Sequence, residues 1–158
     1  MANRKGRYMK KIISIFAAVV LAFVIQIAHA HSNPQLEINK QHVIEFYDKA
    51  INQKNFEAAV KYLGSRYIQH NPAVIDGSAG LKAFVQFLRD HYPNAHSEIK
   101  QVFAEGDYVI LHVHSIREPG TRGRAIFDLF KLEHGKIVEH WDVIQDIPAK
   151  SANPNQMF

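Results

Sequence analysis

Residues 126–145 read IFDLFKLEHGKIVEHWDVIQ, and this stretch decides the fold. Apolar residues recur at alternate positions on both sides of His134-Gly135, which is the period of a β-strand. Glycine supplies the positive φ that a tight hairpin turn requires. The stretch therefore predicts two antiparallel strands, over residues 124–132 and 136–144, joined by a turn at His134-Gly135.

Three ionisable residues, Asp128, His140 and Asp142, lie inside this otherwise apolar strand pair. Residues two apart on a strand share a face, so His140 and Asp142 point to the same side. The side of Asp128 depends on the turn. A two-residue loop pairs Leu129 with His140 and places Asp128 on the opposite face. A three-residue loop with a bulge at Gly135 pairs Asp128 with His140 instead and brings all three together. The sequence leaves both registers open.

The rest of the chain divides into a helical half and a strand half. Helical spacing of apolar residues predicts three helices: from an N-cap at Asn39 to about Lys54, a short one capped by Asn55, and one that Ser78 caps and Pro93 ends. Period-two segments then predict further strands over residues 99–103 and 108–116, and residues 67–70 form a short extended piece. Helices followed by antiparallel strands predict an α+β fold, with helices over one face of a curved sheet and a ligand cavity between the two layers.

The first thirty residues have the features of a secretory signal peptide. Five basic residues lie between Arg4 and Lys11, residues 12–27 are almost entirely apolar, and Ala28-His29-Ala30 fits the small-x-small cleavage pattern. We expect cleavage after Ala30 and a periplasmic or secreted mature protein with no stable membrane association. The alternative is a retained membrane anchor, although the apolar run is shorter than the roughly 20 residues that span a bilayer.

Removal of this segment changes the net charge of the protein. The whole chain has a formal charge of +4, but residues 31–158 hold fourteen Lys and Arg against fifteen Asp and Glu, a net charge of −1. The basic character therefore belongs to the export segment. It gives no support for binding to nucleic acid or to an anionic membrane.

The residue types exclude several kinds of chemistry. The chain has no cysteine, so it has no disulfide, no thiolate metal site and no cysteine nucleophile. His112, His114, His140 and Asp142 are chemically adequate for zinc or iron, but neither a helical HExxH motif nor a named two-histidine-carboxylate spacing is present. There is also no nucleotide-binding or serine-hydrolase fingerprint. We therefore expect neither a metal nor a cofactor.

Several polar residues are predicted to border the cavity beside the hairpin, namely His70 and His112 with Asp128, His140 and Asp142. Burial in such a cavity raises the pKa of a carboxyl group and prepares it for proton transfer. Each also has a structural alternative. His112 can face solvent on a strand edge, His70 can form the turn before Pro72, and Asp142 can pair with Arg124 across the hairpin.

Six segments together resemble the SnoaL-like (polyketide-cyclase-like) branch of the nuclear transport factor 2-like superfamily. They are YIQHNP (67–72), DG (76–77), GDYVILH (106–112), DLF (128–130), GKIVEHWDVIQ (135–145) and NPNQMF (153–158). The resemblance runs from about Asn39 to the C-terminus. It is strongest to a small bacterial subgroup described as predicted aldol-condensation enzymes.

The resemblance implies a specific architecture. We expect a cone-shaped, strongly curved mixed sheet whose mouth is closed by three helices, and a homodimer formed through the outer face of the sheet. The domain then covers residues 39–148, preceded by a leader over 31–38 and followed by a tail over 149–158.

The resemblance also implies roles for individual residues. In SnoaL-type cyclases an acidic residue near the end of the chain acts as acid and base in a cofactor-free intramolecular aldol closure, and Asp142 matches it. Ketosteroid isomerase, a relative, holds an enolate oxygen with a tyrosine and a protonated aspartate, which Tyr47 and Asp128 match. Asn71 stands where that isomerase has its aspartate base, so steroid isomerisation is not expected.

The sequence thus predicts a lyase, isomerase or cyclase that acts on a small apolar molecule without a cofactor. Asp142 or His70 removes a proton α to a carbonyl, and His140 or His112 orients or reprotonates the substrate. Tyr47, Asp128 and Asn71 hydrogen-bond the developing enolate. The residues expected to contact substrate are Tyr47, Asn71, Phe84, His112, Phe130 and Trp141. The alternative is a non-catalytic module of the same fold that binds a small ligand.

Overall fold

Helices make up most of the first half of the described chain. A computed structural model describes residues 33–158, and its helical elements are α2 (Pro34–Tyr47), the π-helical turn η1 (Asp48–Asn52), α3 (Phe56–Ala59), the 3-10 turn η2 (Val60–Tyr62) and α4 (Gly77–His91). The predicted signal peptide and its cleavage site lie outside the described residues. None of the helices within 33–158 is long and apolar enough to cross a bilayer.

Helix α2 begins earlier than the sequence predicts. Its first residue is Pro34, whose fixed φ and missing N–H suit the first position of a helix. Asn39, the predicted N-cap, lies inside the helix instead and is only 2% exposed. Its side-chain oxygen accepts a hydrogen bond from Gln35 Nε2 at 2.9 Å, so a polar residue with the composition of a cap is satisfied within the helix. The predicted start at Asn39 is therefore wrong, and residues 34–38 are helical.

The other two helix starts lie close to their predicted positions. Asn55 caps α3 as expected, because its side-chain oxygen accepts a hydrogen bond from the backbone N–H of Ala58 at 3.0 Å. Helix α4 begins at Gly77, directly after Asp76, which replaces Ser78 as the N-cap. The helix buries Leu81, Val85 and Leu88, a spacing of three to four residues that keeps them on one face.

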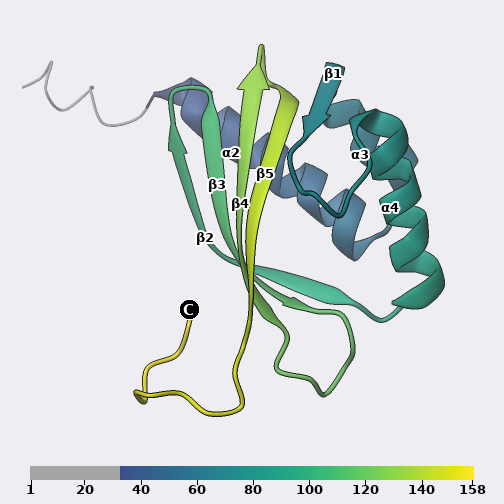
Figure 1. Ribbon diagram of the computed structural model, residues 1–158. Coiled ribbons are helices and arrows are strands. Elements are labelled where there is room, and N and C mark those ends of the chain that lie inside the picture. The colour runs from purple at the N-terminus through teal and green to yellow at the C-terminus, as the bar shows by residue number, and fades with distance from the viewer. Residues whose placement is uncertain (1–32) are drawn as a thin grey trace, which may run out of the picture. The chain divides into compact units, whose positions relative to one another are not determined.

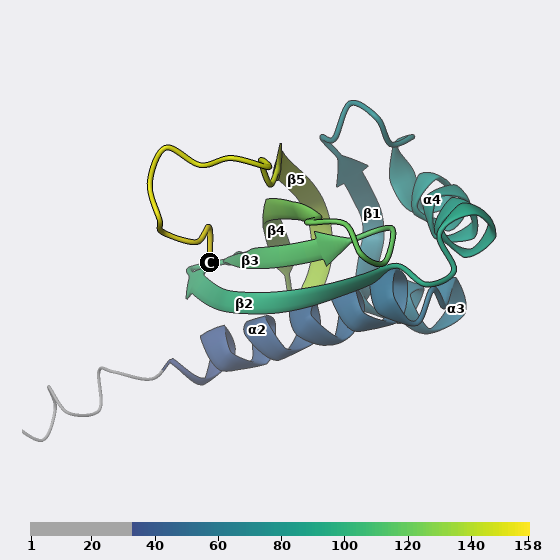
Figure 2. The ribbon, with the colours of Figure 1, turned by 90° about the horizontal axis from the view of Figure 1, so that it is seen from below.

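The sheet has five strands in the spatial order β1-β5-β4-β3-β2. The strands are β1 (Leu63–Gln69), β2 (His96–Glu105), β3 (Tyr108–Ile116), β4 (Arg124–Glu133) and β5 (Lys136–Asp146). Strand β1 runs parallel to β5, and every other pair is antiparallel. Figures 1 and 2 show the strands bending together, with the helices on one side of the sheet and the C-terminal tail on the other. The predicted α+β fold, with a curved mixed sheet and three helices, is confirmed.

The two faces of the sheet have different partners. On the inner face, Val109, Leu111 and Val113 of β3 are fully buried in the core. Helix α2 packs against this face, and the ring of Phe46 meets that of Phe130 edge to face, with centroids 5.8 Å apart. The alternate residues of the same strands form the outer face, which includes several exposed apolar side chains.

The β4–β5 hairpin has a two-residue turn. Glu133 pairs with Lys136, and the two residues between them have positive φ, 52° at His134 and 74° at Gly135. Two positive values in succession define the primed turn that matches the twist of the flanking strands. The turn itself is therefore the shorter of the two alternatives.

The register beyond the turn nevertheless matches neither alternative, because strand β5 contains one extra residue. Leu132 pairs with Ile137 but Lys131 pairs with Glu139, which leaves Val138 without a partner and makes it a β-bulge. Asp128 then pairs with Asp142 rather than with His140. The bulge has a physical cause in the core: Ile137 and Val138 are both buried, at 0% and 3% exposure, whereas a regular strand turns successive side chains to opposite faces.

Candidate functional site

A cavity of about 530 Å³ lies between the inner face of the sheet and the helices. Phe46 and Tyr47 of α2 line it together with Leu81, Phe84, Phe87 and Leu88 of α4. Most of the other walls are apolar as well, including Ile126, Phe130 and Ile144 of the hairpin. An apolar cavity with a few convergent polar groups is the usual form of a small-molecule site.

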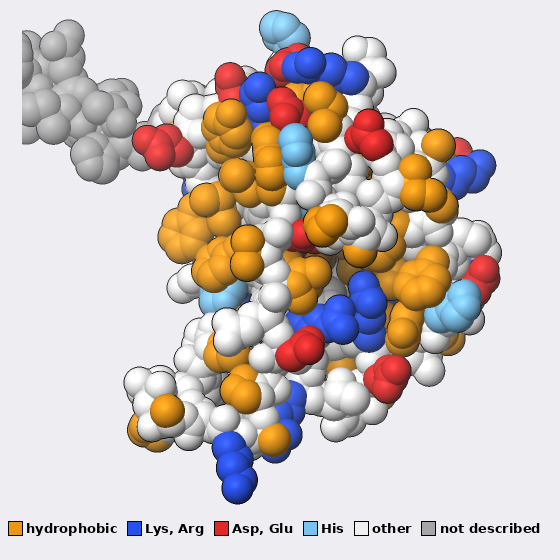
Figure 3. All heavy atoms as spheres, viewed as in Figure 1, with side chains coloured by type: hydrophobic (Ala, Val, Ile, Leu, Met, Phe, Trp, Pro, Cys, Tyr) orange, Lys and Arg blue, Asp and Glu red, His pale blue; other side chains and the backbone are white. Residues whose placement is uncertain are grey.

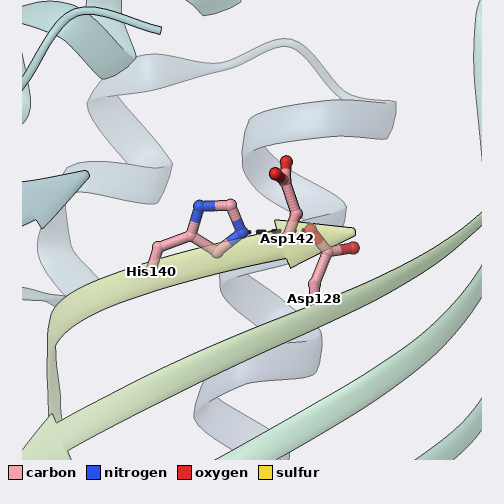
Figure 4. A group of neighbouring side chains, drawn as sticks. All are labelled: Asp128, His140 and Asp142. Carbon is pink, nitrogen blue, oxygen red and sulfur yellow. Dashed lines mark hydrogen bonds and ion pairs between the residues drawn. The ribbon is translucent and has the colours of Figure 1, made fainter. Parts of the chain in front are cut away.

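Three ionisable side chains of the hairpin line this cavity, and Figure 4 shows them side by side, with His140 and Asp128 joined by a hydrogen bond. Asp128 comes from β4, and His140 and Asp142 come from β5. The bulge at Val138 gives all three the same face of the sheet, since Asp142 pairs directly with Asp128 and His140 lies two residues away. His140 Nε2 and Asp128 Oδ1 are 3.0 Å apart, and both side chains are nearly buried.

Gln69 of β1 completes a chain of hydrogen bonds to the imidazole. Its Oε1 lies 3.0 Å from His140 Nδ1 and also accepts a hydrogen bond from the backbone N–H of Asn71 at 2.9 Å. The second contact identifies this atom as the carbonyl oxygen of the amide, because a backbone N–H needs an acceptor. The amide nitrogen of Gln69 points the other way and donates to the Tyr67 hydroxyl at 3.3 Å.

This orientation of the Gln69 amide fixes where the protons of His140 lie. A carbonyl oxygen only accepts, so Nδ1 of His140 must be the donor in that contact. One further proton then lies in the contact between Nε2 and Asp128 Oδ1. The pair holds it either as a neutral imidazole beside a carboxylic acid or as an imidazolium beside a carboxylate. In both forms the buried pair is a proton reservoir at the floor of the cavity.

Burial sets the proton affinities of the groups around this pair. The pKa of Asp128 is raised, chiefly because the carboxylate is removed from water, and the attraction of His140 offsets only part of that effect. Its second oxygen, Oδ2, is buried and has no hydrogen-bond partner among the described residues. Burial, followed by the negative charge of Asp128, raises the pKa of Tyr47 well above its usual range. Tyr47 therefore keeps its proton and can donate it in a hydrogen bond.

Asp142 is held by Asn71, which follows the end of β1. Asn71 Nδ2 donates to Asp142 Oδ2 at 2.6 Å. The Asn71 side chain is itself fixed, since its oxygen accepts a hydrogen bond from the backbone N–H of Ala73 at 2.8 Å. Arg124, the alternative partner of Asp142, forms its ion pair with Asp146 instead, at 2.9 Å. The Asp142 carboxylate is thus oriented by a neutral amide and is not neutralised by an arginine.

Seven of the predicted site residues line the cavity. They are Tyr47, Asn71, Phe84, Asp128, Phe130, His140 and Asp142. The geometry supports the predicted inward position of Asp128, which arises from the bulge at Val138 and not from a three-residue turn.

The predicted positions of His70, His112 and Trp141 are wrong, because none of the three lines the cavity. His70 stacks on Trp141 with ring centroids 4.4 Å apart, and its Nε2 lies 3.3 Å from Glu139 Oε2. Trp141 alternates with His140 and Asp142 along β5, so it points to the outer face. His112 is buried on that outer face as well, where it stacks on Phe127 at 4.4 Å.

Sequence reasoning missed six polar residues that line the cavity, namely Tyr67, Gln69, Ser97, Ser115, Arg117 and Arg124. The signal for the first two was present: the segment Tyr67-Ile68-Gln69-His70 was predicted to be extended, and period two places Tyr67 and Gln69 on one face and His70 on the other. The same alternation places Arg124 on the face of Asp128. Arg117 follows the end of β3, where no pattern in the sequence fixes the direction of its side chain.

The cluster also has the composition of a cation site. Asp128, His140 and Asp142 each place one ligand atom within 4.8 Å of the others, and they are the group among the described residues that could hold a metal ion. One nitrogen and two carboxylate oxygens suit several divalent cations. In that case Gln69 would orient the imidazole through its Nδ1–H, as partners of metal-bound histidines commonly do.

Comparison with known proteins identifies relatives of this fold. The model of the SnoaL-like polyketide cyclase family matches residues 41–152. No curated protein matches the chain.

Solved structures that resemble the chain include a candidate polyketide cyclase from Bacillus cereus ATCC 10987, with 22% identity, a TM-score of 0.63 and coverage of 73% of this chain and 79% of that one. A candidate SnoaL-like polyketide cyclase from Jannaschia sp. CCS1 has 17% identity, a TM-score of 0.58 and coverage of 72% and 89%. AclR, a candidate hydroxylase from Streptomyces galilaeus, has 20% identity, a TM-score of 0.59 and coverage of 72% and 82%. At these identities the likeness shows a shared fold.

Proposed function

The chain belongs to the SnoaL-like polyketide cyclase family, and we propose that it is a cofactor-independent acid–base enzyme that acts on a small apolar carbonyl compound. The observation that carries the proposal is the position of the Asp142 carboxylate within 4.8 Å of the buried Asp128–His140 pair, in a mostly apolar cavity. An enolate reaction needs a base that removes a proton from carbon and a donor that supplies a proton to the enolate oxygen. Asp142 is the candidate base, and the Asp128–His140 pair holds the proton.

In the proposed mechanism Asp142 is the general base. Asn71 holds one of its oxygens at 2.6 Å, which orients the carboxylate toward a C–H bond α to the substrate carbonyl. The carbon–hydrogen electron pair moves to form the enolate, and the Tyr47 hydroxyl, which keeps its proton, donates a hydrogen bond to the enolate oxygen. The Asp128–His140 pair is the second proton source: the hydrogen bond between Nε2 and Oδ1 opens, and the shared proton passes to the enolate oxygen. Ring closure by aldol addition, or reprotonation at a second carbon, then completes a cyclase or isomerase cycle.

The proposed chemistry does not use His70 or His112, because both lie on the outer side of the sheet. Asp142 therefore remains the base and His140 the histidine that handles the proton. The finer assignment to an aldol-condensation subgroup fits this arrangement, because intramolecular aldol closure proceeds through the same enolate.

The experiment follows α-proton exchange directly and so does not require the natural substrate. Purified protein is incubated in D₂O with 2-tetralone or ethyl 2-oxocyclohexanecarboxylate, and loss of the α-proton signal is followed by NMR. Removal of a general base costs about 10²–10⁴-fold in rate, so Asp142→Asn is expected to exchange at least a hundredfold more slowly. Asp90→Asn, on the exposed face of α4, is the matched control. Exchange at the wild-type rate in Asp142→Asn overturns the assignment, and binding of these ketones without exchange in the wild type supports a ligand-binding module instead.

We further propose that two copies pair through the outer face of the sheet. Phe103, Ile110, Phe127 and Val143 are exposed there, and Val143 is 73% exposed. Strand pairing brings Phe127 beside Val143 and Phe103 beside Ile110, so the four belong to one continuous face. Isologous pairing of such a patch would cover it. Sedimentation equilibrium is expected to show a dimer that Val143→Glu dissociates, whereas Ile38→Glu, on α2, leaves it intact; a monomeric wild type contradicts the proposal.

Finally, we propose that the protein is exported to the periplasm or secreted. The support is the composition of residues 1–30 alone. Expression of the full chain in a Gram-negative bacterium, followed by fractionation and intact-mass measurement, is expected to find a product that begins at His31 in the periplasm. A full-length product in the cytoplasm or the inner membrane contradicts the proposal.

A further inference from the structure

Two arginines line the cavity away from its acid–base cluster. Arg124 is the first residue of β4, and alternation along that strand gives it the same face as Ile126 and Asp128. It pairs with Asp146 of β5, at the end of the same hairpin. Arg117 follows the last residue of β3 and lines the cavity as well. Figure 3 shows basic side chains gathered in the central hollow of this face, next to hydrophobic ones.

The positive charge of this pair is poorly neutralised. Within residues 33–158, Arg117 has no carboxylate at ion-pair distance, and its guanidinium lies over the ring of Tyr92, 5.4 Å from the centroid. Arg124 contacts Asp146, but the Asp146 side chain is 82% exposed, so that contact is largely screened by water. Burial, followed by the charge of Arg124, lowers the pKa of Arg117. Two partly buried guanidinium groups repel each other and have lost part of their hydration. A bound anion would offset both effects.

The two arginines also stand at a junction between an apolar and a polar space. Both line the apolar cavity, and both line a second, more polar hollow of about 730 Å³ that includes Tyr92, Glu118 and Arg122. A molecule with an apolar body and a charged end fits such a junction, because the body can leave water while the charge stays close to it.

On this basis we propose that the substrate class of the site is an apolar carboxylic acid, whose carboxylate binds Arg117 and Arg124 while its reactive carbonyl reaches Asp142 and the Asp128–His140 pair. The inference rests on the proposed function for the reactive end, but the binding of the acid end does not depend on it. Guanidinium groups suit carboxylates because their paired N–H donors match the two oxygens. Asp146, exposed and on the rim, is the group that the incoming carboxylate displaces.

The strand geometry sets the length of such a molecule. Arg124 and Asp128 are four residues apart on one strand. At a rise of 3.3–3.4 Å per residue, their Cα atoms are about 13 Å apart. The Ile126–Ile144 pair lies between them and lines the cavity. The substrate class is therefore an acid whose carboxylate and reactive carbonyl are separated by an apolar body of about this length.

The proposal is tested by ligand charge. Isothermal titration calorimetry compares decanoate, methyl decanoate and decylammonium, which share one apolar body and differ at the head. Decanoate is expected to bind at least tenfold more tightly than the ester, and decylammonium least tightly. Arg117→Gln is expected to remove most of the preference for the acid and leave the affinity for the ester unchanged. Arg122→Gln removes the same charge from the same loop outside the apolar cavity, and it is expected to keep the preference.

The possible results separate this inference from the proposed function. Equal affinity for decanoate and its ester, or a preference for decanoate that Arg117→Gln leaves intact, overturns the anionic substrate class whatever the rate of α-proton exchange. A preference that disappears in Arg117→Gln but not in Arg122→Gln supports it even when Asp142→Asn shows no loss of exchange, in which case the acid is a bound ligand and not a substrate.

Discussion

Gln69 Oε1 lies 3.0 Å from His140 Nδ1, although the two residues are 71 positions apart in the chain. The contact exists because β1 runs parallel to β5 along the edge of the sheet, with Gln69 paired to His140. Through this contact, the Gln69 amide on β1 sets the tautomer of the His140 imidazole on β5. The proton between His140 and Asp128 is therefore controlled from outside the hairpin.

The first prediction concerns this control. Replacement of Gln69 by Leu leaves the buried Nδ1–H without an acceptor, which costs about 1–3 kcal/mol and favours the other tautomer. We expect ¹⁵N NMR of the wild type to show a protonated Nδ1 in His140, and the Gln69→Leu spectrum to lose that signature, with slower α-proton exchange. Gln69→Glu keeps an acceptor at this position and is expected to keep Nδ1 protonated. An unchanged tautomer in Gln69→Leu would show that the amide does not set it.

The second prediction concerns stability as a function of pH. Because burial raises the pKa of Asp128 in the folded protein above the unfolded value of about 3.9, the folded state binds the proton more tightly. This contribution to stability is complete below pH 3.9 and decreases as the pH rises through the folded pKa. Asp128→Asn cannot titrate, so the free energy of unfolding of the wild type is expected to fall relative to that of the variant as pH rises from about 4.

Urea denaturation of both proteins at a series of pH values measures this difference. The comparison with Asp128→Asn removes the contribution of surface carboxyl groups such as Glu139, whose lowered pKa acts with the opposite sign and is common to both proteins. A difference that grows in favour of the wild type at higher pH contradicts a raised pKa for Asp128.

The third prediction separates the two sides of the sheet. His70 lies on the outer side, where its exposed ring contacts Trp141 and Glu139, so it has no route to a molecule in the cavity. His70→Gln is expected to exchange α-protons at the wild-type rate and to change the free energy of unfolding by no more than about 1 kcal/mol, the usual value of a surface ion pair. A loss of ten-fold or more in the exchange rate would return His70 to the mechanism.

The fourth prediction concerns metal. The proton held between His140 and Asp128 occupies the place that a cation would take among the same three side chains. Dialysis against EDTA is expected to leave the exchange rate and the melting temperature unchanged, and added Zn²⁺ to inhibit by competing for the ligands. Loss of activity on dialysis, with recovery on addition of one equivalent of a divalent metal, contradicts the cofactor-free mechanism.

The sequence predicted the architecture well because most helices and strands follow from local patterns of apolar residues. The period-two segments and the His134-Gly135 turn predicted four of the five strands close to their bounds, and Asn55 was recognised as a cap. Asn39 was misread because its burial depends on the packing of α2 against the sheet, which no local pattern expresses. Long-range pairing was likewise invisible: the parallel alignment of β1 with β5, which brings Gln69 to His140, joins segments from opposite ends of the domain.

The site was predicted in part for the same reason. Alternation along β5 placed His140 and Asp142 together, but Trp141 was also predicted to contact substrate, although the same alternation turns it to the other face. His112 has the composition of a site residue but belongs to the outer face, since it pairs with Phe127 and not with an inward residue. Arg117 could not be predicted, because it follows the end of a strand and its direction depends on the loop to β4.

The unpaired Val138 determines how this hairpin responds to the loss of a residue. Next to Val138 on its turn side, Leu132 and Ile137 belong to the core, and the strand residues beyond it provide the acid–base groups. Removal of this single residue would keep the turn and every later pair, because Glu139, His140 and Asp142 already lie opposite Lys131, Phe130 and Asp128. Strand β5 would then alternate regularly, and His140 and Asp142 would still face the cavity. Relatives that lack the extra residue are therefore expected to keep both the fold and the inward position of the three acid–base residues.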